Sequence, residues 1–562
     1  MNAQKNFVKG AAILSSTGIF AKIFGMVYTI ITTNVLQSIG MAPYMAAFPV
    51  YTFLLALSSA GLPVAISKMV SERIALGDHY AANLVFRKAL KAMLLIGLVT
   101  SVLMMALSKP ISLVLNIPHS DLTIMGIAPA LFFVAVMSTY RGYFQGMMRM
   151  TPTAVSQIIE QLVKLGVGIA LMYLLLPYGT EYGALGAILG ITVSEVVSLA
   201  YLIFLYNRRK AKIKADIWRS SVTRLRQGIG KKMFYLALPI IIGSCAMPLV
   251  QLADSTIITN TLMSMKHIVL FGKEILIDTA VIGSDAAHEI VDSLYGLTSY
   301  INPIINLPAV FSMALAMSLV PAISSSNASH DLSGVSSKAG IGFKLSLLIA
   351  LPCGAGLYLF SEPIISLLYT VKDPLGLGLF AEAGKLMSIM GISVFFLTIL
   401  QTMTGVLQGL GKTYLPVINL FIGLAVKIAI SIITIRIPEI NIAGAFYGTA
   451  ACYFIAALLD VICVIKHTRA RISLLNTILK PLLAGAVMGA FLYFALPLVS
   501  STGADGVLAY SSIKTLLAVF VAAAVYGFFM LLFRAVNKED LKYFPGGRRI
   551  AAFAVKLHIW KR

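Results

Sequence analysis

Charged residues are scarce in this chain of 562 residues. Asp, Glu, Lys and Arg make up 12% of it, whereas hydrophobic residues make up 59%. An ordinary soluble domain carries about twice that share of charge, and roughly half of its residues are apolar. The mean hydropathy is +0.90. These values exclude an ordinary soluble domain and predict a protein that crosses a membrane many times.

Cysteine is also rare. The four cysteines (Cys245, Cys353, Cys452 and Cys463) all fall in apolar stretches. None has the spacing of a disulfide framework or a metal site, so we interpret them as small core residues. The seven histidines are scattered and give no zinc or haem signature. We therefore expect no metal and no cofactor.

Acidic residues are few, with 22 Asp and Glu against 44 Lys and Arg. In a soluble chain the resulting net charge of +22 would suggest a nucleic acid partner. In a membrane protein the same excess marks the cytoplasmic loops, which collect Lys and Arg. We therefore expect membrane lipids as neighbours and no nucleic acid.

Long apolar stretches are abundant, and fourteen of them reach the ~20 residues that a membrane span needs. Because irregular backbone cannot face lipid, each is predicted to be a helix. The predicted spans are 11–35, 42–66, 86–108, 121–146, 153–177, 183–206, 233–262, 292–323, 340–360, 378–402, 413–436, 441–466, 474–499 and 511–535. The predicted fold class is an all-α polytopic membrane protein. The first span has no clear cleavage site and is long enough to remain as an anchor.

Basic residues predict the orientation. They precede the first span at Lys5 and Lys9, fill the segment 207–232 with ten Lys or Arg against one acid (Asp216), and recur in the tail from Lys538 onward. These segments lie on one side, which the positive-inside rule assigns to the cytoplasm. An even number of spans then puts both termini in the cytoplasm of a cell membrane protein.

Four short motifs return once each, in the same order and at nearly constant spacing. Leu62–Ser67 returns as Val320–Ser324, Ser108–Ile111 as Ser361–Ile364, Gln145-Gly146 as Gln408-Gly409, and Gly186/Gly190 as Gly444/Gly448. The offsets are 321 − 63 = 258, 361 − 108 = 253, 408 − 145 = 263 and 444 − 186 = 258. This predicts two parallel six-helix repeats, a common plan among transporters.

The repeat defines the predicted domains. They are a first lobe (1–206), a basic cytoplasmic linker (207–232), a second lobe (233–466), a two-helix appendage (467–535) and a basic amphipathic tail (536–562). The glycine pairs predict close helix packing. Pro63 and Pro321 are predicted to kink equivalent helices.

Polar residues gather in one apolar region, 140–164. It carries Arg141, Gln145, Arg149, Gln157, Glu160, Gln161 and Lys164. Such groups cost several kcal/mol at membrane depth unless they face a partner or a wet cavity. In the corresponding segment of the second repeat, Lys427 follows Gln408 by 19 residues, just as Lys164 follows Gln145.

Each of these residues has two interpretations. Arg141 suits a diphosphate but could equally be a cytoplasmic anchor. Glu160 and Lys164 either bind a ligand or form a self-neutralising pair, four residues apart on one helix face. Lys22 either faces a cavity or snorkels to the inner surface. It lies ~18 Å into its span, which is far for a lysine side chain to reach the surface. The lone acids Glu195, Asp254 and Asp460 either pair with lysines or carry H⁺ or Na⁺.

Two stretches are similar to a known family. Gly61–Lys68 with Gly77-Asp78-His79, and Arg141–Gly146 with Pro152-Thr153-Ala154, resemble the stage V sporulation protein B branch of polysaccharide exporters. This branch belongs to the MOP superfamily, with the lipid II flippases and the MATE drug antiporters. The resemblance implies two six-helix lobes around a cavity that opens alternately to each side. The two further C-terminal spans fit the lipid II flippases, in which they hold the lipid tail.

The resemblance also implies site residues. Ala21–Gly25 is similar to a Ser-Arg-x-x-Gly motif, with Lys22 in place of a cavity arginine and Tyr28 where a second arginine is common. A cation site of some relatives uses an acid in the seventh helix and polar groups in the eleventh and twelfth. Its counterparts here are Asp254, Asn419 and Thr449.

The leading hypothesis is a flippase, not an enzyme, for an undecaprenyl diphosphate-linked cell-wall or polysaccharide precursor such as lipid II. The candidate cavity cations are Lys22, Arg141, Lys164 and Lys427, and the candidate polar contacts are Gln145, Gln157, Glu160 and Gln408. We expect a monomer that is driven by Na⁺, H⁺ or the membrane potential.

Two other classes stay open. A cation-coupled MATE-type multidrug exporter would need an acidic cavity, whereas the first half shows more cations than acids. A membrane glycosyltransferase or polymerase would need catalytic acids, which Asp278, Asp285 and Glu289 could supply from the outer loop 263–291. The duplication favours a transporter over an enzyme.

Overall fold

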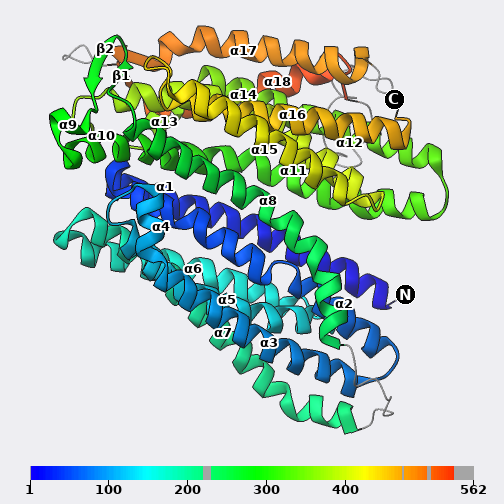
Figure 1. Ribbon diagram of the computed structural model, residues 1–562. Helices are drawn as coiled ribbons and strands as arrows, with labels where there is room; N and C mark the ends of the chain where they lie inside the picture. The colour runs from blue at the N-terminus through cyan, green and yellow to red at the C-terminus, as the bar shows by residue number, and fades with distance from the viewer. Residues whose placement is uncertain (1, 219–228, 471–473, 503–507, 537–562) are drawn as a thin grey trace. The chain divides into compact units, whose positions relative to one another are not determined.

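The structure is a computed structural model that describes residues 2–218, 229–470, 474–502 and 508–536. It consists almost entirely of helices (Figure 1). The chain divides into two compact units. Unit 1 contains Met1–Lys266 and Leu276–Ser299, and unit 2 contains His267–Ile275 and Tyr300–Arg562.

Unit 1 consists of helices among the described residues. They are α1 (Asn2–Ser59), α2 (Leu62–Ala75), α3 (His79–Ala106), α4 (Ser108–Leu115), α5 (Ser120–Gly146), α6 (Thr151–Leu175), η1 (Leu176–Tyr178), α7 (Thr180–Trp218), α8 (Ile229–Met263), α9 (Thr279–Ile282) and α10 (Ser284–Gly296).

Unit 2 begins with a small hairpin, to which Leu276 of unit 1 also belongs, and then continues as helices. Its elements are β1 (His267–Leu270), β2 (Lys273–Leu276), α11 (Thr298–Ala328), α12 (Leu332–Leu359), α13 (Ser361–Leu368), α14 (Leu379–Gly409), α15 (Tyr414–Ile435), α16 (Ala443–Thr468), η2 (Leu474–Leu479), α17 (Lys480–Val499), β3 (Ser500–Thr502), β4 (Leu508–Tyr510) and α18 (Ser512–Leu532). The strands β3 and β4 pair antiparallel.

Thirteen helical segments among the described residues are long and apolar enough to cross a membrane. The first, Ser16–Ala75, is 60 residues long; it covers most of the predicted span 11–35 and all of the predicted span 42–66. Gln37 interrupts α1 between them, with φ 59° and ψ −175°. The predicted count of fourteen is therefore compatible with the structure, and the all-α polytopic fold is confirmed.

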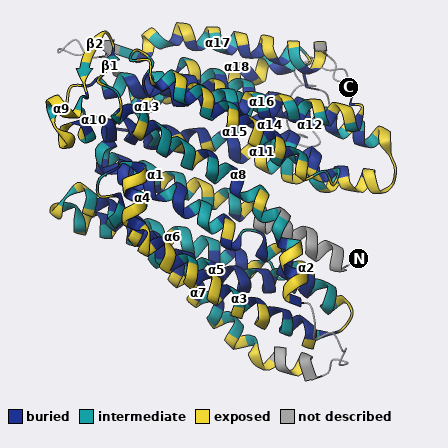
Figure 2. Ribbon diagram, viewed as in Figure 1, coloured by how far each residue is buried: buried dark blue, intermediate teal, exposed yellow. Residues whose placement is uncertain are grey.

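The two units resemble each other in the burial of their helices, as expected from the duplication. In the most apolar windows of α5 and α14, 67% and 72% of the residues are buried. Figure 2 colours the ribbon by the burial of each residue. For the helices that follow them, α6 and α15, the shares are 11% and 28%. The central helix and its peripheral neighbour thus have the same order in both halves.

The repeats also share a helix cap. Asp78 accepts a hydrogen bond from the Ala81 amide at 2.8 Å and starts α3, and Asp331 accepts one from the Gly334 amide at 2.8 Å and starts α12. The two caps lie 331 − 78 = 253 residues apart, which is the offset of the Ser108 and Ser361 motifs. A side-chain oxygen at this position satisfies a backbone donor that the first turn leaves open.

The glycine pairs bring the last two helices of each six-helix repeat together, as predicted. A Cβ on Gly190 of α7 would overlap the backbone of Gly168 in α6. A Cβ on Gly448 of α16 would overlap Ser431 in α15. Since 431 − 168 = 263, the offset of the Gln-Gly motif, both halves use the same contact.

The predicted pairing of Pro63 with Pro321 is wrong. Gly142 of α5 faces Pro63, whereas its repeat equivalent in α14, Gly405, faces Ala316. The packing counterpart of Pro63 is therefore Ala316, at an offset of 316 − 63 = 253. Pro63 lies in the first turn of α2, but Pro321 lies inside α11. The sequence motif therefore recurs at an offset of 258, whereas the packing recurs at an offset of 253.

The C-terminal appendage packs onto unit 2. Apolar side chains of α17 and α18, including Met488, Leu492 and Tyr526, form a core with Leu345 of α12. Tyr510 of β4 donates a hydrogen bond to Glu362 of α13 at 2.6 Å. The outer faces of α17 and α18 expose large apolar side chains such as Phe494 and Phe520, as a lipid-facing surface would.

The two units do not coincide with the predicted lobes. Helix α8, the first helix of the predicted second lobe, packs against α1 and α2 within unit 1. Compactness and duplication are separate properties, so the boundaries at 206 and 233 stay predictions. Linker residues 219–228 and the predicted amphipathic tail from residue 537 lie outside the described residues.

We predict that Gly190→Ala lowers the thermal unfolding temperature in detergent by several degrees. The new methyl group must separate two backbones, and overpacking of this kind costs about 1–3 kcal/mol. Gly166→Ala, on an open part of α6 with no atom within 4 Å of the added Cβ, is the matched control and should leave the temperature unchanged or raise it. Equal temperatures for the two variants would contradict the packing described.

Candidate functional site

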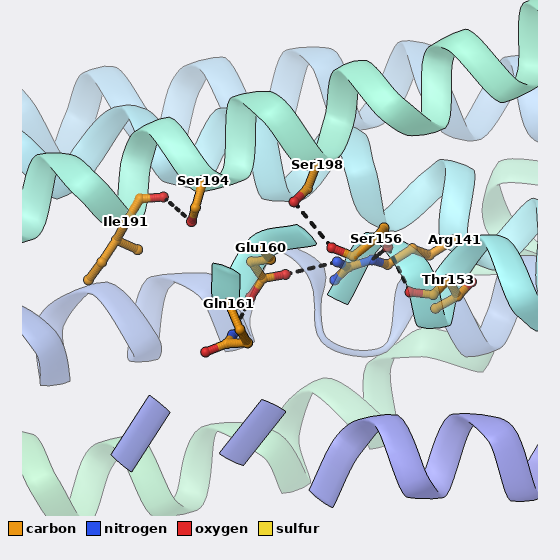
Figure 3. Close-up of polar contacts among 8 residues, drawn as sticks. All are labelled: Arg141, Thr153, Ser156, Glu160, Gln161, Ile191, Ser194 and Ser198. Atoms are coloured by element: carbon orange, nitrogen blue, oxygen red, sulfur yellow. Dashed lines mark hydrogen bonds and ion pairs between the residues drawn. The ribbon is translucent and has the colours of Figure 1, made fainter. Parts of the chain in front are cut away.

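Two charged residues of the polar region 140–164 form an ion pair in unit 1. Arg141 extends from α5 and Glu160 from α6, and Arg141 Nη2 lies 2.9 Å from Glu160 Oε2 (Figure 3). The side chains are 16% and 20% exposed. Desolvation makes such a pair costly to form and more costly to break, because one charge would then remain uncompensated.

The pair lies within the apolar length of its helices. Arg141 is 146 − 141 = 5 residues before the end of α5, and Glu160 and Lys164 are 160 − 151 = 9 and 164 − 151 = 13 residues after the start of α6. At ~1.5 Å per residue these positions are ~8, ~14 and ~20 Å from the helix ends. Three charged groups therefore alternate in sign into the span, and the deepest is Lys164.

Ser156 orients the guanidinium from the other side. Arg141 Nε donates to Ser156 Oγ at 3.0 Å, while that hydroxyl donates to the Thr153 carbonyl at 2.7 Å. Ser198 of α7 donates to the Ser156 carbonyl at 3.2 Å. Figure 3 shows these contacts joining α5, α6 and α7 around Arg141. The guanidinium is held in one orientation, as bidentate binding of an anion requires.

Lys164 lies against aromatic rings of α1. Its Nζ is 4.7 Å from the centre of the Tyr28 ring and 6.0 Å from that of Phe48. The Tyr28 hydroxyl donates to the Ala187 carbonyl of α7 at 2.7 Å, which fixes the ring. Where relatives are expected to carry an arginine, this chain thus has a tyrosine that supports a lysine of α6 through a cation–π contact.

A second acid completes the cluster. Glu195 of α7 is 5% exposed and interacts electrostatically with Glu160, Arg141 and Lys164. Among the described residues, its buried Oε2 has no hydrogen-bond partner, and neither has the buried Oε1 of Gln157 on α6. An oxygen buried without a donor normally costs 1–3 kcal/mol, so these two acceptors mark a place where a proton, water or ligand group belongs.

The site therefore combines acids with bases rather than being purely cationic. Arg141 and Lys164 contribute two positive charges, and Glu160 and Glu195 offer two acids. The sequence offers two interpretations of Glu160, ligand binding or a pair with Lys164. Among the contacts described, its carboxylate pairs with Arg141 instead. We refer to Arg141, Glu160, Lys164 and Glu195 as the tetrad.

The other predicted residues of unit 1 lie around the tetrad or apart from it. Lys22 is exposed on α1, one turn before Gly25, and a Cβ on that glycine would contact Gln161 of α6. Gln145 is half-buried near the end of α5. Asp254 is half-buried in α8. The substrate-binding and ion-coupling roles of all three stay predictions.

Sequence reasoning left Glu195 and Ser156 out of the site. A lone acid in an apolar span indicates that Glu195 needs a partner, but not which one. Ser156 gives no signal, since serine is common in membrane helices. Tyr51, a buried residue of α1 that interacts electrostatically with Glu195 and Glu160, gives none either.

Unit 2 carries a different polar cluster on the equivalent helices. Thr404 of α14 and Asn419 of α15 donate to the two oxygens of Asp460 of α16, at 2.8 and 2.7 Å. Thr404 and Asn419 are the repeat equivalents of Arg141 and Ser156, because 404 − 141 and 419 − 156 are both 263. Asp460 is fully buried, and within the described part of the chain it has no cationic partner.

The remaining candidates of unit 2 are separate from this cluster. Lys427, the repeat equivalent of Lys164, is 1% exposed where α15 packs on α16. Gln408 is exposed at the end of α14. Thr449 donates to the Ala445 carbonyl of its own helix at 3.0 Å. Of the three predicted ion-coupling residues, only Asn419 contacts a carboxylate among the contacts described.

The polysaccharide biosynthesis protein family model matches residues 7–327, more than half of the chain, and the MatE model matches residues 296–433. Stage V sporulation protein B of Bacillus subtilis (strain 168) is 26% identical over 97% of this chain and 98% of its own length. Lipid II flippase MurJ of the same organism is 27% identical over 86% of this chain and 87% of its own.

A solved structure supports the fold. The inward closed conformation of lipid II flippase MurJ matches 93% of this chain and 98% of its own, with a TM-score of 0.64 at 14% identity. At that identity the likeness concerns the fold alone. Together these findings identify a multi-pass membrane transporter or flippase. The chain belongs to the polysaccharide biosynthesis protein family, as a stage V sporulation protein B-like member of the MOP superfamily.

Proposed function

We propose that this protein flips an undecaprenyl diphosphate-linked cell-wall or polysaccharide precursor, such as lipid II, across the cytoplasmic membrane. The observation that carries the proposal is Arg141, a guanidinium held at membrane depth by Ser156 and Glu160. A planar guanidinium presents parallel donors that match phosphate oxygens. Lys164 adds a second positive charge deeper in the same helix pair.

The physical need for such a site follows from the cargo. A diphosphate joined to sugars is large and anionic and cannot cross hydrocarbon unaided, whereas its polyprenyl tail is soluble there. A cavity that binds the head group and opens alternately to each side moves the head while the tail stays in lipid. No covalent bond changes, so the protein acts as a transporter and not as an enzyme.

The relatives support this class of cargo by name. One is a lipid II flippase and another a sporulation protein, and the family model is for polysaccharide biosynthesis. Under the positive-inside rule, the basic segments at 207–232 and from Lys538 onward support a cytoplasmic location of both termini. The working form is a monomer in contact with membrane lipids.

One candidate site for coupling to a cation lies in unit 2. A fully buried carboxylate that has only neutral donors favours uptake of a proton or Na⁺. Asp460, held by Asn419 and Thr404, meets that description. The membrane potential acts in addition on any net charge that moves with the cargo.

A cation-coupled drug exporter of the MATE type is the second candidate. The MatE model covers residues 296–433, which include Thr404 and Asn419. An acidic site such as Asp460 suits a cationic drug. Transport of a lipophilic cation by proteoliposomes that leave lipid II in place would favour this candidate.

We predict that Arg141→Lys slows flipping of fluorescent lipid II in proteoliposomes roughly 10- to 150-fold, the equivalent of ~1.5–3 kcal/mol for a charged hydrogen bond. Lysine keeps the charge but loses the paired donors. The matched control is Arg208→Lys at the cytoplasmic end of α7, where the guanidinium lies 5.1 Å from the Phe204 ring. It should flip lipid II at the wild-type rate. Equal rates for both variants would argue against Arg141 as the head-group ligand.

We also predict that Lys22→Ala abolishes lipid II flipping while the protein remains folded by size-exclusion chromatography. Lys22 lies one turn from the place where α1 meets α6, so its ammonium can meet a head group that approaches the tetrad. Lys91→Ala, a change at a similarly exposed lysine of α3, serves as the control. Normal transport by Lys22→Ala would count against this part of the site.

A further inference from the structure

Arg141 already has an anion in the absence of cargo. Glu160 occupies Nη2 at 2.9 Å, and Ser156 occupies Nε at 3.0 Å. A diphosphate that binds this guanidinium must compete with the Glu160 carboxylate. It carries two negative charges and more acceptor oxygens, so it is the stronger partner for a planar donor group.

Displacement of Glu160 changes the charge balance of the tetrad. Without cargo the two acids face two bases. With a bound diphosphate the formal sum is two positive and four negative charges in a place with little access to water. Like-charged carboxylates in such surroundings do not both stay ionised, and one of them takes up a proton.

The described groups that interact with Glu195 supply few positive charges. The titratable groups that face Glu195 are Arg141 from α5, Glu160 and Lys164 from α6, and Tyr51 from α1. Tyr28 of α1 faces Lys164. The two phenols carry no positive charge. Of the groups named here, Lys164 then remains to balance both carboxylates.

Two oxygens are placed to serve the added proton. Glu195 is 5% exposed, and its Oε2 has no donor. Gln157 lies one helical turn before Glu160, and its buried Oε1 also has no donor. A proton bound to Glu195 would turn its unpartnered carboxylate oxygen into a hydroxyl. A proton bound to Glu160 could form a hydrogen bond to Gln157 Oε1.

We propose that binding of a diphosphate head group at Arg141 is coupled to the uptake of one proton by the carboxylate pair Glu160 and Glu195. This rests on the proposed function. The balance is simple: the diphosphate replaces Glu160 on the guanidinium, one proton from water joins a carboxylate oxygen, and no other bond forms or breaks. The tetrad and the bound diphosphate together then carry a formal charge of −1 instead of −2.

The test is isothermal titration of the full-length detergent-solubilised protein with a short-chain, water-soluble lipid II analogue. The titration is repeated at one pH in buffers with different enthalpies of ionisation. The slope of the observed enthalpy against buffer enthalpy gives the protons taken up. Each phosphate of the analogue has one ester bond and one shared anhydride bond. Its single remaining acidic group is strongly acidic and does not titrate near neutral pH.

The expected result for the wild type is uptake of about one proton per analogue, with an affinity that weakens by up to about tenfold per unit rise in pH. Glu195→Gln should bind with uptake near zero. Glu160→Gln should also lose the uptake and should bind more tightly, because Arg141 is no longer occupied. Glu72→Gln, which removes an exposed partner of Lys232, is the matched control and should keep the uptake of one.

Two outcomes separate the claims. Binding by the wild type with no proton uptake would overturn this inference and leave the proposed function intact. No binding of the analogue by a folded wild-type protein would contradict the proposed function and the inference together. The wild-type titration decides between these outcomes even where a variant fails to fold.

Discussion

A charge in the apolar interior of a membrane protein needs an opposite charge or a donor nearby, and the architecture of unit 1 meets that need at Arg141. The pair with Glu160 requires α5 and α6 to keep their mutual rotation, and Ser198 ties α7 to the same point. The contact between Gly190 and Gly168 brings α7 close enough for Glu195 to join. Close packing and charge compensation therefore depend on each other.

The mixture of acids and bases in the tetrad has a consequence for a carrier. A purely cationic cavity would bind an anionic head group strongly, but it would be costly to close when empty. Under the proposed function, Glu160 occupies the guanidinium while no cargo is bound, so the empty site stays neutral. The same carboxylate lowers the net affinity, which assists release on the far side.

The two halves share a scaffold but differ in chemistry. Equivalent positions hold Arg141 and Thr404, and Ser156 and Asn419. In unit 1 an arginine pairs with a glutamate of its neighbouring helix. In unit 2 an aspartate of the last helix of the repeat is held by neutral donors. The duplication thus kept the helix contacts and let the polar groups diverge, to an arginine–glutamate pair in one half and an aspartate with neutral donors in the other.

Helix positions and the duplication could be predicted from the sequence because they depend on runs of apolar residues and on repeated small residues. The partners of buried charges could not. Glu160 and Lys164 are four residues apart, yet Glu160 pairs with Arg141 and Lys164 lies on Tyr28, since helix rotation decides the outcome. The pairing of Pro63 with Pro321 failed because a short apolar motif does not carry packing register.

The most direct test of this account is a structure of the protein with lipid II bound. The quantity to measure is the distance between the Arg141 guanidinium and the Glu160 carboxylate. The account predicts that Arg141 Nη2 and Glu160 Oε2, now 2.9 Å apart, separate beyond hydrogen-bond distance while the guanidinium contacts the diphosphate. An intact pair between Arg141 and Glu160, with the diphosphate bound elsewhere, would contradict it.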